Sequence, residues 1–143
     1  MQKLVEQLNG FSEASAGRPV EAAQIIRCQK ELRQNDITAI PEDYLDFLHK
    51  FNGFAWNGSF LFGIAPFKDF FLDILRENLF ICHPRSDEVI ILGFNEYDYL
   101  AYNASLSCYQ IIDKAEFMVL NTYTGCAHAV RHILKIEDDD QYI

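Results

Sequence analysis

Long apolar segments and a secretion signal are both lacking in this chain. The longest apolar runs, around FLFGIAPF and VIILGF, are far shorter than the about 20 residues that a membrane-spanning helix requires. The first ten residues, MQKLVEQLNG, carry charge and contain no apolar stretch of signal-peptide length. We therefore expect a soluble cytoplasmic protein. Its 143 residues, 50% of them apolar, suit one domain that spans the whole chain.

Several motifs of catalysis and metal binding are also missing. The sequence has no Gly-Lys-Ser/Thr motif for a phosphate-binding loop and no His-Glu-x-x-His motif for a zinc peptidase. The four cysteines are widely spaced and form no Cys-x-x-Cys pair, so they are interpreted as reduced, mostly buried thiols. These are Cys28, Cys82, Cys108 and Cys126. We expect no cofactor, no metal, no catalytic residue and no enzymatic activity.

Three chemical alternatives nevertheless stay open. His128 and His132 share one face of a predicted helix and would form a zinc site only with Cys126 or with Cys82-His83. A cysteine nucleophile would need a histidine close to it in space. Carboxylates near one another in sequence are candidate acid–base pairs, namely Glu42, Asp43 and Asp46, and separately Glu96 and Asp98. Ordinary packing and solvation explain each group at least as well.

Positive charge is scarce. Twelve basic residues stand against 21 acidic ones, which gives a net charge of −9. Residues 1–35 hold five basic and four acidic groups, whereas residues 36–143 hold seven and 17. A domain this acidic repels nucleic acid and anionic membranes and attracts a basic protein. The alternative interpretation is that the acidity only keeps the protein soluble.

Helical periodicity predicts five helices. The clearest covers residues 42–51, where Tyr44, Phe47, Leu48 and Phe51 recur with helical spacing after Pro41. The other predicted helices cover residues 2–9, 19–34, 69–79 and 124–135.

The second of these, residues 19–34, has Pro19 in its first turn and turns Val20, Ala23, Ile25 or Ile26, Cys28 and Leu32 inward. In residues 69–79, Asp69 is the expected N-cap, and the inward residues are Phe70, Phe71, Ile74 and Leu75. In residues 124–135, Thr124 is the expected N-cap, and the inward residues are Val130, Ile133 and Leu134.

The segment FNGFAWNGSFLFG carries three glycines at intervals of five residues. Gly53 is predicted to end a helix with positive φ, Asn57-Gly58 to form a two-residue hairpin turn, and Gly63 to mark a bulge or a close backbone approach. Strands are expected near residues 60–64, 88–94, 97–103, 107–112 and 116–121. The predicted fold is α+β, a mainly antiparallel sheet of five or six strands with N-terminal helices and a C-terminal helix packed on it. Residues 137–143 are read as a solvated acidic tail.

Four motifs follow one another between about residues 20 and 135. They are PEDYLDFLHKFNG, an aromatic-glycine hairpin ending in FLFGIAPF, VIILGFNEYDYLAYN and YQIIDKAEF. The matching residues are Pro41, Tyr44, Phe47, Leu48, Asn52, Gly53, Leu61, Phe62, Gly63 and Gly93. This order resembles the SUKH superfamily, which includes the Knr/Smi-like regulators of cell-wall glucan synthesis. The resemblance implies an antiparallel α+β fold and, for bacterial members, immunity proteins that neutralise secreted toxins, often nucleases. It transfers no catalytic residue, and the Glu-rich last helix of the family is replaced by GCAHAVRHILK.

The segment Glu96-Tyr97-Asp98-Tyr99 alternates acids and tyrosines at the start of a predicted strand. Tyrosine is enriched in protein interfaces, and a neighbouring carboxylate suits an arginine of a basic partner. Trp56, beside the predicted hairpin turn, is a further candidate anchor, although strand tyrosines and a single tryptophan also pack in ordinary cores. We hypothesise a cytoplasmic immunity protein that binds a basic toxin domain, possibly a nuclease. The second hypothesis is a regulatory or scaffold module of the glucan-synthesis-regulator type with an endogenous protein partner. Neither nucleic acid nor membrane is expected as a partner.

Overall fold

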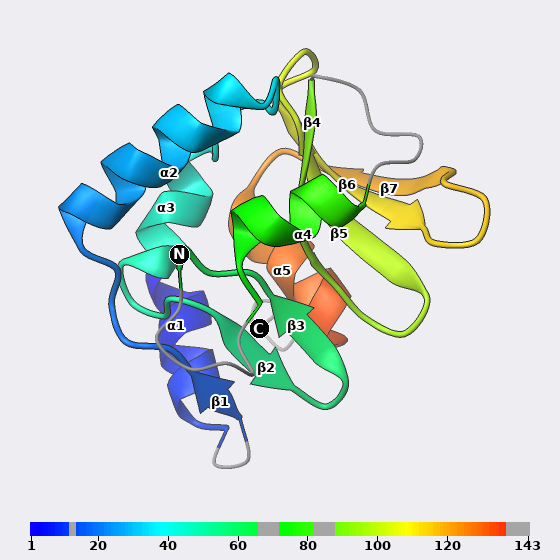
Figure 1. Ribbon diagram of the computed structural model, residues 1–143. Helices are drawn as coiled ribbons and strands as arrows, with labels where there is room; N and C mark the ends of the chain where they lie inside the picture. Colours follow the sequence, from blue (N-terminus) through cyan, green and yellow to red (C-terminus); the bar gives the residue numbers. More distant parts are fainter. Residues whose placement is uncertain (12–13, 66–71, 82–87, 137–143) are drawn as a thin grey trace.

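The computed structural model describes residues 1–11, 14–65, 72–81 and 88–136. Within them, five helices accompany a seven-stranded antiparallel sheet whose strand order follows the chain, β1-β2-β3-β4-β5-β6-β7 (Figure 1). The helices are α1 (Gln2–Asn9), α2 (Ala22–Gln34), α3 (Glu42–Leu48), α4 (Ile74–Phe80) and α5 (Cys126–Leu134). The strands are β1 (Ser15–Ala16), β2 (Phe54–Trp56), β3 (Ser59–Leu61), β4 (Val89–Phe94), β5 (Asp98–Asn103), β6 (Cys108–Asp113) and β7 (Val119–Tyr123). The predicted α+β class is confirmed.

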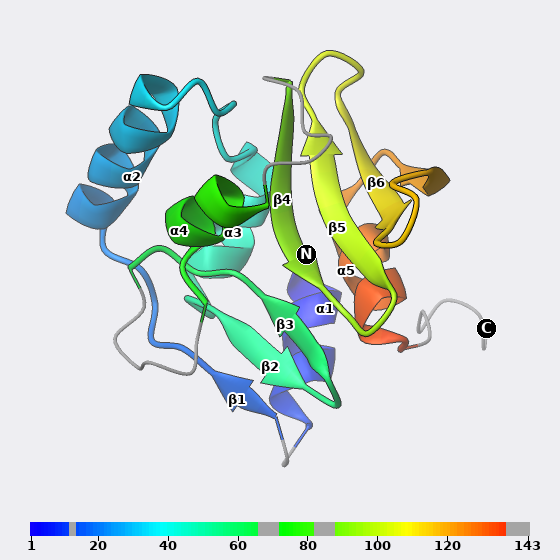
Figure 2. The same ribbon diagram turned by 45° about the vertical axis from the view of Figure 1, so that its right-hand side comes forward.

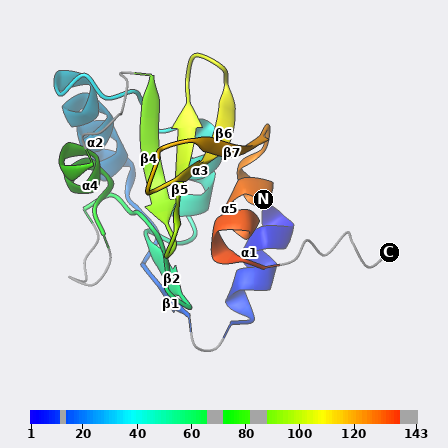
Figure 3. The same ribbon diagram turned by 90° about the vertical axis from the view of Figure 1, so that its right-hand side faces the viewer.

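Helices cover both faces of the sheet. Figure 3 shows α1 and α5 on one side and α2 with α4 on the other, and α5 packs across β3, β5, β6 and β7. Strand β4 is buried on both faces, since its consecutive residues Ile90, Ile91 and Leu92 are all buried. Leu100 and Ile111 pair across β5 and β6 and are buried with the predicted inner face of α5. None of the described helices has the length and apolar character needed to cross a membrane.

The apolar stripe predicted for residues 42–51 is buried as expected. Tyr44, Phe47, Leu48 and Phe51 all belong to the core. Helix α3 itself ends at Leu48, but the Phe51 N–H still bonds to the Phe47 carbonyl at 2.9 Å, so the stripe keeps its helical spacing. The Tyr44 hydroxyl donates to the carbonyls of Phe62 (2.5 Å) and Leu92 (3.1 Å). This side chain therefore links α3 to the place where β3 separates from β4.

Two buried asparagines complete the hydrogen bonding of the sheet. β3 pairs with β4 only through Phe60 and Leu61, so the first half of β4 has no β3 partner. Asn78 of α4 takes that place, because its Oδ1 accepts from the Ile91 N–H and its Nδ2 donates to the Ile91 carbonyl, each at 2.8 Å. Asn52 likewise bonds to the backbone N–H and carbonyl of Ile64, just beyond the end of β3. Figure 2 shows α4 lying against β4.

Two of the three glycines behave as predicted, and Gly53 does so in part. Gly53 has the predicted positive φ, 102°, but it does not end the helix, because α3 stops at Leu48 with His49 as its C-cap. Asn57 and Gly58 have φ values of 52° and 79° in the two-residue turn between Trp56 and Ser59. Positive φ at both central residues is the signature of a type I′ hairpin turn. Gly63 lies where the backbones approach closely, since a Cβ there would be 2.7 Å from the Asn52 carbonyl oxygen.

Helix α2 begins later than predicted. Pro19 precedes it, because Glu21 is the N-cap and forms a reciprocal capping box with Gln24. Ile25 is half-buried and Ile26 exposed, which resolves the alternative that the sequence left open. The inward placement of Ala23 was wrong, since it is exposed; Val20 is buried but lies outside the helix.

Helix α4 also begins later, at Ile74 instead of residue 69. Asp73 is its N-cap: the carboxylate accepts from the Arg76 N–H at 3.0 Å and from the Ala65 N–H at 2.7 Å. Ile74 is buried and Leu75 half-buried, as predicted, whereas Asp69, Phe70 and Phe71 lie outside the described residues.

The ends of two elements near the C-terminus differ slightly from the expectation. α5 is capped by Gly125 instead of Thr124, and Lys135 ends it in the left-handed conformation with φ 57°. β7 begins at Val119 instead of residue 116, because Phe117 has a φ of 58° in the preceding turn. Cys28, Cys108 and Cys126 are buried free thiols, while Cys82 and the acidic tail lie outside the described residues.

Candidate functional site

The candidate partner-binding segment lies at the turn that joins β4 to β5. Asn95 is buried and holds this turn, because its Oδ1 accepts from the N–H groups of Tyr97 (3.1 Å) and Asp98 (2.9 Å). Its Nδ2 donates to the Ile133 carbonyl in the last turn of α5 at 3.0 Å. The turn is thus fixed to the end of α5. Glu96 and Tyr97 are exposed on it, Tyr97 by 63% of its surface.

The two tyrosines of this segment have different environments. Tyr99 is half-buried, and its ring lies 5.7 Å from that of Phe117. Burial raises the pKa of the Tyr99 hydroxyl, with a smaller contribution from the Glu77 carboxylate of α4. Tyr99 therefore packs against the sheet, and Tyr97 is the tyrosine that a partner can contact.

A lysine lies beside the acidic turn. The Lys114 Nζ is 4.1 Å from the centre of the Phe94 ring and 5.5 Å from that of Tyr99, within range of cation–π attraction. Burial lowers the pKa of this ammonium group, and the carboxylates of Asp98 and Glu96 partly offset the effect. The two acids of the segment are therefore electrostatically coupled to a nearby cation.

A second lysine approaches from α5. The Lys135 Nζ lies 5.8 Å from the centre of the Tyr97 ring. We call Glu96–Asp98 together with Lys114 and Lys135 the Tyr97 surface. It joins two carboxylates, two ammonium groups and one exposed aromatic ring, so its charge is mixed, whereas the sequence indicated an acidic surface.

Trp56 lies at the same end of the sheet but away from the Tyr97 surface. It pairs with Ser59 at the hairpin turn, and its half-buried ring stacks on Phe11 with centroids 4.7 Å apart. Strands are spaced by about 4.8 Å, so Trp56 in β2 lies roughly 10 Å from β4. The structure brings Glu96, Tyr97 and Asp98 together and places Trp56 in a separate aromatic pair.

The two helix histidines also differ. The His132 Nδ1 lies 2.5 Å from the Tyr123 hydroxyl and the two rings meet edge to face, while His128 is exposed one turn earlier. In the described part of the chain, no three His, Cys, Asp or Glu side chains are grouped to hold a metal ion. The alternative zinc ligands Cys82-His83 lie outside that part.

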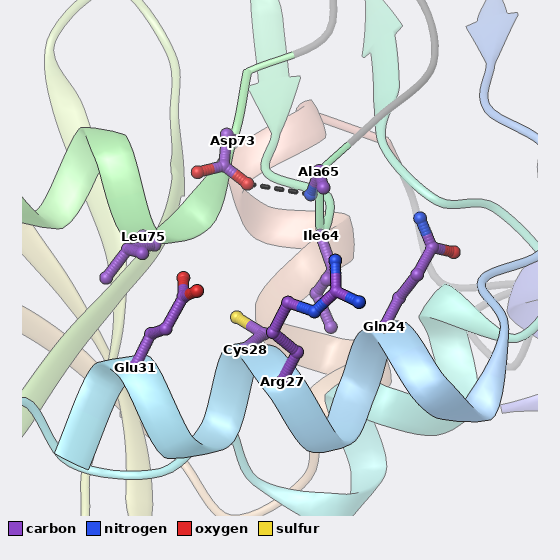
Figure 4. Close-up of a pocket in the computed structure, with 8 residues that line it drawn as sticks. All are labelled: Gln24, Arg27, Cys28, Glu31, Ile64, Ala65, Asp73 and Leu75. Atoms are coloured by element: carbon purple, nitrogen blue, oxygen red, sulfur yellow. Dashed lines mark hydrogen bonds between the residues drawn. The ribbon is translucent and has the colours of Figure 1, made fainter. Parts of the chain in front are cut away.

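A cleft of about 160 Å³ lies between α2 and the start of α4. Figure 4 shows the residues that line it. Cys28 lines it, and burial, followed by the carboxylates of Asp73 and Glu31, raises the pKa of its thiol to about 12. A nucleophilic cysteine needs the opposite shift, toward the thiolate. The Asp73 carboxylate is itself engaged by the Ala65 N–H, drawn as a dashed line, so this cleft does not present an activated nucleophile.

The other candidate carboxylates lie along the exposed side of α3. Glu42, Asp43 and Asp46 are all exposed. Asp46 borders an open groove of about 640 Å³ between α1 and α3, which also contains Glu6. This α1/α3 groove is a second region that holds two carboxylates, here beside Lys50, and it lies at a different place from the Tyr97 surface. The groove is lined by Met1, Gln2, Val5, Glu6, Asn9, Asp46, His49 and Lys50.

Sequence reasoning missed three contributors to the Tyr97 surface. Lys114 and Lys135 come from the ends of β6 and α5, and only the packed sheet brings them to the turn. Asn95 had a local signal, since asparagine before a tight turn commonly bonds to the backbone two or three residues later. Nothing in the sequence indicated the hydrogen bond from the Asn95 side chain to α5.

No protein-family model and no curated protein matches this chain. The resemblance to the SUKH superfamily therefore stays a prediction from the motif order.

Proposed function

We propose that this protein is a non-enzymatic, cytoplasmic binding module that acts as an immunity protein by masking a basic toxin domain. The observation that carries the proposal is an exposed tyrosine on a rigid turn. Tyr97 stands between Glu96 and Asp98, and the Asn95 side chain holds that backbone with two hydrogen bonds and joins it to α5 with a third.

Rigidity supports a binding role, because an anchor that is ordered before the encounter loses little conformational entropy on association. Tyrosine adds a large contact area at low entropic cost and is among the residues that dominate interface energies. The Lys135 ammonium beside the Tyr97 ring further restrains the side chain.

Charge supports a basic partner. The chain carries −9 overall, and a field of this sign speeds the approach of a cationic protein. At the Tyr97 surface, Glu96 and Asp98 offer carboxylates that an arginine can bind through two parallel hydrogen bonds. The nearby lysines limit binding to a partner that displaces or avoids them, which adds specificity.

The test is surface plasmon resonance of the full chain against the product of the neighbouring gene, at several salt concentrations. Tyr97→Ala should raise the dissociation rate at least tenfold, since hot-spot truncations cost about 2 kcal/mol or more. Association should slow as salt rises, because exposed charges are screened beyond about 8 Å at physiological ionic strength.

A matched pair of variants locates the charge effect. Glu96→Gln/Asp98→Asn and Glu6→Gln/Asp46→Asn remove the same net charge from the Tyr97 surface and from the α1/α3 groove, respectively. The first should weaken binding more than the second. Equal effects, or a stronger effect of the groove variant, would place the contact elsewhere. Binding to an endogenous regulatory protein instead would overturn the immunity role.

A further inference from the structure

Strand β7 is one edge of the sheet, and its outer side has no partner strand in the described chain (Figure 1). The segment Met118–Thr124 reads MVLNTYT and contains no charged residue and no proline. Met118, Val119 and Leu120 are exposed by 58%, 49% and 53% of their surface. Three consecutive exposed apolar side chains thus lie beside the free edge.

Soluble proteins usually protect such an edge. Lysine, proline, an inward-pointing charge or a covering loop prevents the unpaired N–H and C=O groups from recruiting another strand. β7 has an irregular register opposite Ile111 and Ile112, but it has none of the protecting residue types between Met118 and Thr124. An uncharged strand with high β-propensity is well suited to pair with a further strand.

We propose that β7 pairs with β7 of a second copy of this chain, antiparallel and about a two-fold axis, to form one continuous sheet across two molecules. In this arrangement the backbone groups of both edges are satisfied. With the axis at Asn121, the middle residue of β7, Val119 lies opposite Tyr123 of the other copy and Leu120 lies opposite its Thr122.

Charge favours a second copy over a basic partner at this edge. A cationic strand would find no carboxylate between Met118 and Thr124, whereas an identical strand meets only neutral groups. The assembly also stops at two molecules, because the opposite edge of the sheet, β1, contains only Ser15 and Ala16 and is too short to pair with a further chain and extend a filament.

The dependence on salt concentration distinguishes self-association through β7 from partner binding at the Tyr97 surface. Two chains of −9 repel each other, so screening should strengthen self-association. Binding of a basic partner should show the opposite salt dependence. One edge-to-edge contact is expected to bury less than about 1,200 Å², and such interfaces are weak.

The experiment is sedimentation equilibrium of the full chain from about 1 μM to 1 mM, a range that covers weak dimers. A monomer–dimer equilibrium is expected, with tighter dimers at higher salt. Leu120→Lys should weaken the dimer at least tenfold. Leu106→Lys is the matched control, since Leu106 is 65% exposed in the turn between β5 and β6 and gains the same charge. The control should dimerise like the wild type.

Hydrogen exchange of the wild type provides a readout that needs no variant. Amides of β7 should exchange more slowly at high than at low protein concentration, while those of the turn around Tyr97 should not change. A chain that stays monomeric throughout, a dimer unaffected by Leu120→Lys, or β7 amides insensitive to concentration would each overturn the proposal. None of these outcomes bears on the partner-binding role of Tyr97.

Discussion

The side-chain amide of Asn52 forms two hydrogen bonds with the backbone of a single residue, Ile64. Its Nδ2 donates to the Ile64 carbonyl at 2.9 Å, and its Oδ1 accepts from the Ile64 N–H at 2.6 Å. Both groups are buried. The amide therefore acts as a short piece of β-strand that holds the chain leaving β3 against the end of α3.

Replacing Asn52 by alanine should destabilise the protein by about 2–6 kcal/mol, because two buried backbone groups lose their partners at about 1–3 kcal/mol each. Urea unfolding followed by circular dichroism measures the change. Asn121→Ala is the control, since Asn121 is exposed on β7, and it should alter stability by no more than about 0.5 kcal/mol. Similar losses for both variants would refute the role of the Asn52 amide.

The Tyr→Phe change should have opposite consequences at two buried positions. Tyr44 donates to the carbonyls of Phe62 and Leu92, so Tyr44→Phe should cost about 1–3 kcal/mol. The Tyr109 hydroxyl is buried beside the Cys126 thiol, a weak hydrogen-bonding group, and it meets no stronger partner among the described residues. Tyr109→Phe removes a poorly satisfied polar group and should leave stability unchanged or raise it. Thermal melts of both variants decide the matter, and a large loss for Tyr109→Phe would indicate a partner for its hydroxyl.

Adding one methyl group at Gly63 should be poorly tolerated. A Cβ there would lie 2.7 Å from the carbonyl oxygen and from the Oδ1 of Asn52. Gly63→Ala should therefore cost about 1–3 kcal/mol, as overpacking usually does. Gly125→Ala is the matched control, because a Cβ at Gly125 would meet no atom within 4 Å. The two melting temperatures should differ by several degrees, and equal values would contradict the close approach.

Stability should fall at alkaline pH partly because of Cys126. Burial is the main cause that raises the pKa of this thiol from 9.0 to about 12. Below pH 9 the thiol is protonated in both the folded and the unfolded chain, so the full stability is present. Between pH 9 and 12 the unfolded chain releases the proton first, and the free energy of unfolding declines by up to about 1.4 kcal/mol per pH unit.

Urea unfolding at pH 8 and pH 10 tests this, with Cys126→Ala as the comparison. The alanine variant should be less stable at pH 8 but should lose about 1 kcal/mol less on going to pH 10. A Cys126 thiol that reacts rapidly with a disulfide reagent in the folded protein at pH 8 would contradict its protonated, buried state.

Local patterns in the sequence determined much of this fold. The stripe from Tyr44 to Phe51 predicted a buried helical face because side chains three and four residues apart share one side of a helix whatever the surroundings. The Asn57-Gly58 turn was equally local, since its two positive φ values depend on the residues themselves. The strand sequence along β4, β5 and β6 followed from β-propensity and short connections.

Tertiary structure alone decided which residues meet. Asp73 instead of Asp69 begins α4, because the Asp73 carboxylate also bonds to Ala65. Lys114 and Lys135 reach the Tyr97 turn from the ends of two other elements, and this turned an acidic segment into a surface of mixed charge. The outer edge of β7, which has no partner strand among the described residues, likewise exists only in the assembled sheet. Such contacts depend on the packing of distant segments against one core, which the periodicity of a single segment does not contain.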